Sequence, residues 1–369
     1  MLLKPSKIGH RPDYFLMAVV FIITVFGLVM LSSASSEIGK AQFNDSYYYI
    51  KHQITRGLSF GVVGFLLGYL IYYQRWRKFA LPLLIFGLIG LTLVFSGLGL
   101  EVRGSNRWVN LGPLSFQPGE LMKLAFLVYL AAWLSNPKAE RAKNFVEGLL
   151  PFMLISGLVA VLLLLQPATS TMVILLGAGL VMYFSSGAKF KYIAGAVALG
   201  ILVLAVVIYA TPYRRARIIT FLNPAADTQG ESYHINQALI AIGSGGLTGV
   251  GYGQSATKAS YLPTPIDDSI FAVIAEELGF IGAAFVITLF AMLTIRLFWL
   301  AKNTRDNFGR LLLVGFGSII ALQSFTNMAA ISGIVPLTGV PLPFISFGGT
   351  ALAAFLTMSG MALNVSKYT

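Results

Sequence analysis

The chain has 369 residues, of which 56% are hydrophobic and 11% charged, whereas a water-soluble domain has about 25% charged residues. This composition excludes a water-soluble protein. The net charge of +12 comes from 26 Lys and Arg residues that are spread between apolar runs, so we expect contacts with anionic lipid and no nucleic-acid partner. The absence of cysteine excludes disulfides and thiolate metal sites, and the three histidines are too far apart in sequence to indicate a metal cluster.

Apolar runs of about 18 or more residues fill most of the chain, and each is long enough to cross the hydrocarbon core as a helix. We therefore predict an all-α polytopic membrane protein in which residues 1-369 form a single integral membrane domain. The first run lacks a small-residue cleavage site, so it is predicted to be a retained helix and not a signal peptide. About ten transmembrane helices are predicted, at residues 14-34, 57-73, 79-98, 119-134, 147-165, 170-185, 191-210, 270-299, 309-332 and 349-365.

The basic residues alternate with the predicted spans. One set of short segments holds about 15 Lys and Arg in about 53 positions, against about 9 in about 120 positions on the other side, so both termini are predicted to be cytoplasmic. No cytoplasmic loop exceeds about 14 residues, which is too short for a nucleotide-binding fold. We therefore expect no nucleotide cofactor. The energy for the protein's activity is expected to come from a gradient or from an already activated membrane substrate.

The long loops are predicted to lie outside, at 35-56, 99-118, 211-269 and 333-348. The largest, 211-269, joins the seventh and eighth helices. Within it Tyr233, Ile235, Ala238, Leu239 and Ile242 recur at helical spacing, which predicts an amphipathic helix in the membrane interface. A glycine run from Gly243 to Gly253 follows and indicates close backbone approach. Prolines and glycines in 333-348 predict irregular backbone that roofs a cavity.

Two pairs of acidic residues stand near the start of the eighth predicted span. Asp267 and Asp268 can cap this helix, and they can present a carboxylate at the outer membrane surface as a general base for a sugar hydroxyl; the two roles do not exclude each other. Glu276 and Glu277 follow in an apolar stretch, where a charge needs a partner or a cavity. On a regular helix only Glu276 can face a cavity together with Asp268, so Glu277 is predicted to form a structural ion pair.

Cationic candidates occur in two places. Glu120 and Lys123 are three residues apart on the fourth span and can pair with each other; alternatively, Lys123 lies near a cavity mouth with Arg107 and Trp108, where a diphosphate meets positive charge and a sugar stacks on the indole. Arg214, Arg215 and Arg217 follow the seventh span on the outer side. They bind either lipid headgroups or the diphosphate of a lipid carrier.

Several motifs resemble the SEDS family (shape, elongation, division and sporulation), whose members polymerise glycan chains from lipid II. The order and spacing of the motifs agree along nearly the whole chain and look more like the division branch than the elongation branch. The matching stretches are Arg107 to Gly112, Phe116 to Lys123, Tyr213 to Arg217, Gly243 to Gly246, Phe271 with Glu276 to Gly279, and Pro341 to Gly349, which includes Ser346.

This resemblance implies that Asp268 is the essential aspartate. It implies substrate contacts for Arg107, Trp108, Glu120, Lys123, Arg214, Arg215, Arg217, Asp267, Glu276 and Ser346. The chain departs from the family at Ala168, where an Asp usually follows Gln-Pro, and at Asp267 and Ser269, which flank the aspartate in place of Thr and Phe. Asp267 could compensate for the carboxylate that is missing at position 168.

The function implied by the resemblance is an inverting peptidoglycan glycosyltransferase that uses lipid II, releases undecaprenyl diphosphate and acts in division or elongation. Its expected place is the bacterial inner membrane, with the active site on the extracytoplasmic side. A class B penicillin-binding protein and other divisome or elongasome membrane proteins are the expected partners. A divalent cation (Mg²⁺ or Mn²⁺) could assist, but no metal ligand is identified. The alternatives are a lipid II flippase or transporter, and a non-catalytic scaffold for the penicillin-binding protein.

Overall fold

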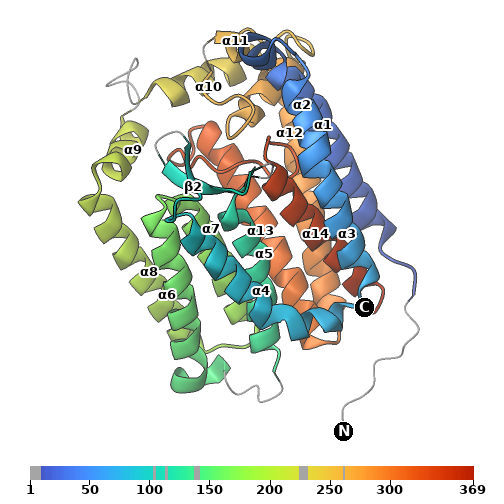
Figure 1. Cartoon of the computed structure of the whole chain (residues 1–369), viewed down its shortest axis with the longest axis vertical. Helices are drawn as coiled ribbons and strands as arrows, with labels where there is room; N and C mark the ends of the chain where they lie inside the picture. The colour runs from blue at the N-terminus through green and yellow to red at the C-terminus, as the bar shows by residue number, and fades with distance from the viewer. Residues whose placement is uncertain (1–9, 103–104, 113–114, 137–141, 224–231, 261) are drawn as a thin grey trace.

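The computed structural model describes residues 10–102, 105–112, 115–136, 142–223, 232–260 and 262–369. Most helices run side by side along the length of the molecule, while α10, α11 and a small sheet lie toward one end, the upper end in Figure 1. The C-terminus lies toward the opposite end. The all-α membrane fold predicted from the hydropathy pattern is confirmed.

Each range predicted to cross the membrane overlaps a helix, although residues 71–72 and 94–98 of two ranges are not helical. The number of about ten spans stays a prediction. Among the described residues, seven helical stretches are long and apolar enough to span a membrane by length and composition: α1, α4, η3 with α6, α8, α12, α13 and α14. The helices are α1 (Tyr14–Phe43), α2 (Tyr48–His52), the π-helix η1 (Gln53–Leu58), α3 (Ser59–Leu70), α4 (Tyr73–Leu93), α5 (Pro118–Leu134), the π-helix η3 (Phe145–Leu149), α6 (Leu150–Leu165), α7 (Thr169–Ser185), α8 (Phe190–Ala210), α9 (Pro212–Leu222), α10 (Tyr233–Ser244), α11 (Thr257–Ser260), α12 (Ile270–Asn303), α13 (Asn307–Ile331) and α14 (Gly349–Ser366).

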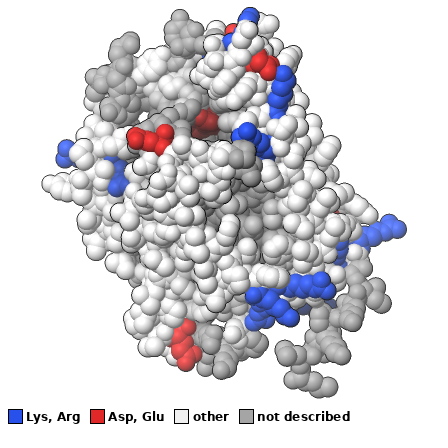
Figure 2. Space-filling view, viewed as in Figure 1, with Lys and Arg blue, Asp and Glu red and all other residues white. Residues whose placement is uncertain are grey.

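Two polar contacts, one partly buried and one buried, mark the ends of the apolar layer on α1. At one end Asp13 caps α1 by accepting from the Leu16 amide at 2.7 Å and pairs with Arg296 at 2.5 Å. At the other end Ser33 donates to Glu277 at 2.6 Å. The stretch of α1 between Asp13 and Ser33 is about 30 Å long at 1.5 Å per residue, which is the thickness of the hydrocarbon core. Charged side chains are correspondingly scarce across the middle of the face shown in Figure 2.

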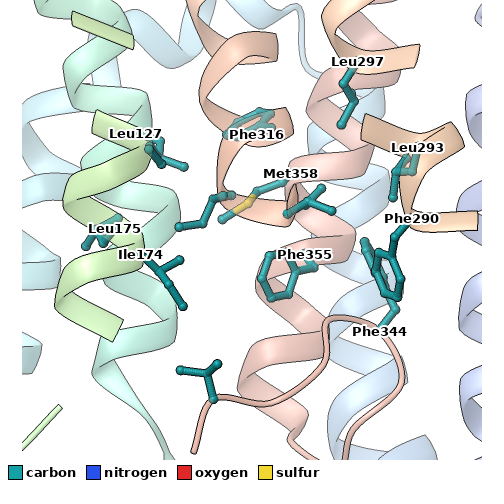
Figure 3. Close-up of a cluster of buried hydrophobic side chains, with 14 of the residues drawn as sticks. Leu127, Ile174, Leu175, Phe290, Leu293, Leu297, Phe316, Phe344, Phe355 and Met358 are labelled. Atoms are coloured by element: carbon teal, nitrogen blue, oxygen red, sulfur yellow. The ribbon is translucent and has the colours of Figure 1, made fainter. Parts of the chain in front are cut away.

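The core lies between α5, α7, α12, α13 and α14. Figure 3 shows Leu127, Ile174 and Leu175 on one side, Phe290, Leu293 and Leu297 on the other, and Phe316, Phe355 and Met358 between them. Within their apolar windows, 78% of the residues of α13 and of α14 are buried, but only 6% of those of α8. The helices α13 and α14 therefore form a packed frame, whereas α8 lies at the edge.

The helix predicted over 270-299 is present, but it is not regular throughout, because α12 breaks at Gly279, whose φ is 66° and ψ −164°. The Phe280 amide donates to the Gly246 carbonyl at 2.9 Å instead of to its own helix. Close approach of the backbone allows this bond: a Cβ on Gly249 would lie 2.1 Å from the Glu277 carbonyl oxygen. The predicted role of the glycine run is confirmed.

The loops that are predicted to lie outside contain more regular structure than the sequence indicates. Loop 99-118 forms a three-stranded antiparallel sheet in the order β1 (Gly99–Val102), β2 (Ser105–Asn110) and β3 (Ser115–Phe116), with Val109 opposite both Gly99 and Phe116. Loop 211-269 contains α9, α10 and α11. The predicted amphipathic helix exists as α10 and buries Ile235 and Ala238. Its position in the membrane interface stays a prediction.

Candidate functional site

A cavity of about 1180 Å³ opens among β2, α7, α8, α9, α13 and the two loops around residues 264–268 and 335–341. Six of the predicted site residues line it: Arg107, Trp108, Arg214, Arg217, Asp267 and Asp268. These residues come from three distant parts of the sequence. The loop 333-348 has the predicted irregular backbone and forms one wall of the cavity.

Asp268 presents its carboxylate to this cavity. The N-cap of α12 is Ser269, and no side-chain capping bond forms there, so the interpretation that Asp268 caps the helix is wrong. The Thr264 hydroxyl donates to Asp268 Oδ1. The backbone carbonyl of Asp268 accepts from Asn327 Nδ2 at 2.8 Å. The carboxylate is thus partly exposed and oriented, with Oδ2 toward Gly339.

The neighbouring Asp267 lines the same cavity. Its backbone carbonyl accepts from the Ser346 hydroxyl at 2.5 Å, and Phe347 donates its amide to the Ile266 carbonyl at 2.8 Å. Ser346 is buried and does not line the cavity. Its observed contact is therefore with the loop that carries the two aspartates.

Three guanidinium groups gather on the wall made by β2 and α9. Arg214 donates to the Thr169 hydroxyl at 2.8 Å, and Arg217 donates to the Leu337 carbonyl at 3.1 Å and stacks on the Tyr213 ring. Burial lowers the pKa of Arg107, and the nearby charges of Arg217 and Arg214 act in the same direction. The mutual repulsion of these cations favours an anion between them.

The remaining predicted residues do not line the cavity. Arg215 is exposed on α9. The predicted pairing of Glu120 and Lys123 is confirmed, at 2.5 Å and with both side chains buried. Glu277 forms the predicted ion pair, with Lys258 at 2.7 Å.

The prediction that Glu276 faces the cavity assumes a regular helix from Asp268 onward, and it is wrong because α12 begins only at Ile270. The carboxylate of Glu276 instead accepts from the Ser255 hydroxyl at 2.5 Å and from the Ala256 amide at 3.1 Å.

Ala168 lines the cavity as a small apolar patch. The carbonyls of the two residues before it hold Arg107: Gln166 accepts from Arg107 Nε at 3.1 Å and Pro167 from Nη2 at 2.5 Å. Within the described ranges no group of three His, Cys, Asp or Glu side chains is arranged to hold a metal ion.

Sequence reasoning missed Thr264, Gln323, Asn327 and Gly339, all of which adjoin this site. Gln323 and Asn327 are fully buried amides on α13. A polar residue inside a predicted span is a signal in itself, and it could have identified these two.

Comparisons with known proteins agree along the whole length. The Cell cycle protein family model that covers FtsW, RodA and SpoVE matches residues 13–369. A "Probable peptidoglycan glycosyltransferase FtsW" of Trichlorobacter lovleyi is 37% identical over 370 residues, which cover 99% of this chain and 96% of that protein. Stage V sporulation protein E of Bacillus subtilis is 35% identical over 359 residues, which cover 97% of this chain and 98% of that protein.

Solved structures show the same similarity. The rod shape determining protein RodA of Thermus thermophilus has a TM-score of 0.71 at 29% identity, and the match covers 96% of both chains. A chain from a study of "Structural coordination of polymerization and crosslinking by a peptidoglycan synthase complex" has a TM-score of 0.78 at 30% identity, and the match covers 96% of this chain and 97% of that one. The chain therefore belongs to the FtsW/RodA/SpoVE family of cell cycle proteins, the family that its motifs resemble.

Proposed function

We propose that this chain is a peptidoglycan glycosyltransferase that joins the disaccharide-peptide units of lipid II into a glycan strand. The observation that carries the proposal is one cavity in which Asp268 lies with Arg107, Arg214 and Arg217. The relative from Trichlorobacter lovleyi supports the reaction class, since it is called a probable peptidoglycan glycosyltransferase.

In this mechanism Asp268 takes the proton from the 4-hydroxyl of the acceptor's N-acetylglucosamine. The hydroxyl oxygen then bonds to the anomeric carbon of the donor sugar, and the bond from that carbon to the diphosphate oxygen breaks. Undecaprenyl diphosphate leaves. An α-linked donor that gives a β-1,4 product requires inversion, and hence one in-line displacement without a covalent enzyme intermediate. The hydrogen bond from Thr264 orients the carboxylate for this step.

The guanidinium groups stabilise the negative charge that grows on the departing diphosphate. Preorganised donors aimed at developing charge are often the largest contribution to catalysis, and guanidinium groups bind phosphate oxygens with two parallel hydrogen bonds. Arg214 and Arg217 lie on α9, within the loop that follows the exposed helix α8. A lipid-borne diphosphate would reach them from the bilayer side.

Asp267 is the second acid of the site. We infer that it supplies the negative charge that Ala168 lacks, because both residues line the same cavity. The Asp267 carboxylate together with substrate diphosphate oxygens is a ligand set that Mg²⁺ accepts. Such an ion would neutralise charge on the leaving group, while Asp268 acts as the base.

The basic residues of the short loops support an orientation with the cavity on the extracytoplasmic side of the bacterial inner membrane. For a partner we propose a class B penicillin-binding protein. One structural neighbour comes from a study of a peptidoglycan synthase complex that coordinates polymerization and crosslinking. Other membrane proteins of the division or elongation machinery would join this pair.

The test is Asp268→Asn in purified, reconstituted protein supplied with lipid II, with Asp267→Asn alongside. We expect Asp268→Asn to lower the polymerisation rate by about 100-fold or more, because a general base contributes 10² to 10⁴. Asp45→Asn is the matched control, since Asp45 pairs with Lys51 outside the cavity. Glycan made at the parental rate by folded Asp268→Asn would end the general-base assignment. Translocated but unpolymerised lipid II would favour a flippase.

A further inference from the structure

A chain of buried polar contacts runs from α5 through α13 and the backbone of residues 340–341 to the backbone of Asp268. Its members are Glu120 and Lys123 on α5 and Gln323 and Asn327 on α13, and each has 2% or less of its surface exposed. None of the four lines the cavity. Burying two charges and two amides is costly unless each finds a partner, so their arrangement calls for an explanation.

Asn327 forms the last step of this chain. Its Nδ2 donates to the Asp268 carbonyl at 2.8 Å and to the Val340 carbonyl at 2.8 Å. Both acceptors are carbonyl oxygens, so the amide orientation is fixed and both of its hydrogens are used. One side chain therefore ties the loop that carries the aspartate to the loop that forms the cavity wall.

Gln323 lies one turn earlier on α13 and secures the next residue of the same wall. Its Nε2 donates to the Pro341 carbonyl at 2.8 Å, while its Oε1 accepts from Lys123 Nζ at 2.6 Å. Lys123 is in turn paired with Glu120 at 2.5 Å. The ammonium group can only donate, so it forces the amide oxygen of Gln323 toward α5 and the amide nitrogen toward Pro341.

The wall segment secured in this way also touches the cationic side of the cavity. Leu337 accepts from Arg217 at 3.1 Å. A Cβ on Gly339 would lie 3.7 Å from Asp268 Oδ2 and 3.9 Å from Arg217 Nη2. The segment from Leu337 to Pro341 thus sets the spacing between the carboxylate and the guanidinium, and α13 holds this segment at one end.

We infer that Asn327 and Gln323, the latter oriented by the Lys123–Glu120 pair, are positioning residues for Asp268. This inference rests on the proposed function of Asp268. It assigns Lys123 a role behind the cavity wall, not as a ligand of the substrate diphosphate. If Lys123 bound the diphosphate, its replacement would weaken the affinity for substrate and product. If Lys123 only orients Gln323, its replacement would leave these affinities unchanged.

The test compares kcat, the KM for lipid II and inhibition by added undecaprenyl diphosphate in Asn327→Leu and Gln323→Leu. We expect kcat to fall by about 10- to 100-fold, because small displacements of a catalytic group have large effects. We expect the KM and the inhibition constant to change less than about two-fold, because none of the three guanidinium groups that bind the diphosphate is replaced. Arg214→Gln should instead weaken inhibition by undecaprenyl diphosphate.

Asn364→Leu is the matched control. Asn364 is an equally buried amide that donates to the Tyr69 carbonyl at 2.7 Å and accepts from the Tyr73 amide at 2.8 Å, away from the cavity. Folding is checked by size-exclusion chromatography and thermal unfolding. If Asn327→Leu does not fold, Asn327→Asp replaces it. The double variant Glu120→Gln/Lys123→Met removes both buried charges together and should show the same loss of kcat at unchanged inhibition.

An unchanged kcat in folded Asn327→Leu would overturn the inference, provided that Asp268→Asn is inactive. A weakened inhibition by undecaprenyl diphosphate in the Glu120→Gln/Lys123→Met variant would assign Lys123 to the diphosphate instead. Full activity of Asp268→Asn would reject the proposed role of Asp268 itself, so the two failures are distinguishable.

Discussion

Gly339 lies where the carboxylate of Asp268 and the guanidinium of Arg217 approach the same point of the cavity wall. Its φ of +63° is in the left-handed region, which costs other residues about 1–2 kcal/mol. We expect Gly339→Ala to lower the rate of polymerisation by more than this backbone strain explains, because the added methyl group occupies space between acid and cation. Initial rates and thermal unfolding, measured together, check this.

Gly333→Ala is the control for Gly339→Ala, because it adds backbone strain without placing a methyl group in the cavity. Gly333 has a similar φ of +72°, but its Cβ would face Leu239 of α10 at 3.6 Å, away from the cavity. Both variants should lose stability to a similar extent, and only Gly339→Ala should lose activity. Equal loss of activity in the two would show that strain alone is responsible.

At the scale of elements, the break in α12 depends on the glycine run that packs against it. We expect Gly249→Ala to lower the unfolding temperature and the activity together, because its Cβ would lie 2.1 Å from the Glu277 carbonyl oxygen and would push the loop off the break. Gly253→Ala is the control. It shares a positive φ, +80°, but its Cβ meets nothing within 4 Å, so it should show the backbone strain of about 1–2 kcal/mol and no more.

If Gly253→Ala were as harmful as Gly249→Ala, contact with the break would not be the cause.

The break also explains how α12 fits the bilayer. A straight helix of its 34 residues would be about 50 Å long at 1.5 Å per residue, which exceeds the hydrocarbon core of about 30 Å. The residues from Ile270 to Glu277 are all buried in protein, which permits irregular backbone near the membrane.

At the scale of the whole molecule, orientation in the membrane is directly testable because the chain contains no cysteine. We expect a membrane-impermeant maleimide to label Gln254→Cys in intact spheroplasts, and Lys302→Cys only after the membrane is opened. Both side chains are exposed, on the loop before α11 and near the end of α12 respectively. The reverse labelling pattern would place the cavity on the cytoplasmic side and contradict the proposed use of lipid II outside.

Hydropathy determined the helices of this protein from the sequence alone, because burial in lipid is a property of some 20 consecutive residues. The motifs around Arg107, Arg214 and Asp268 also predicted which residues would share a site, and the cavity contains all three. Local patterns did not reveal the three-stranded sheet, since strands this short pair only through contacts within the folded loop.

What only the tertiary structure decided is which polar groups meet inside the fold. Glu276 turns away from the cavity because α12 starts after Asp268. Lys123 lies behind the cavity wall because α5 faces Gln323 of α13. Asn327 donates to the backbone carbonyl of Asp268 in one loop and to that of Val340 in another. These contacts depend on the rotation of each helix and on the packing of segments far apart in sequence, and neither is encoded in the composition of a single span.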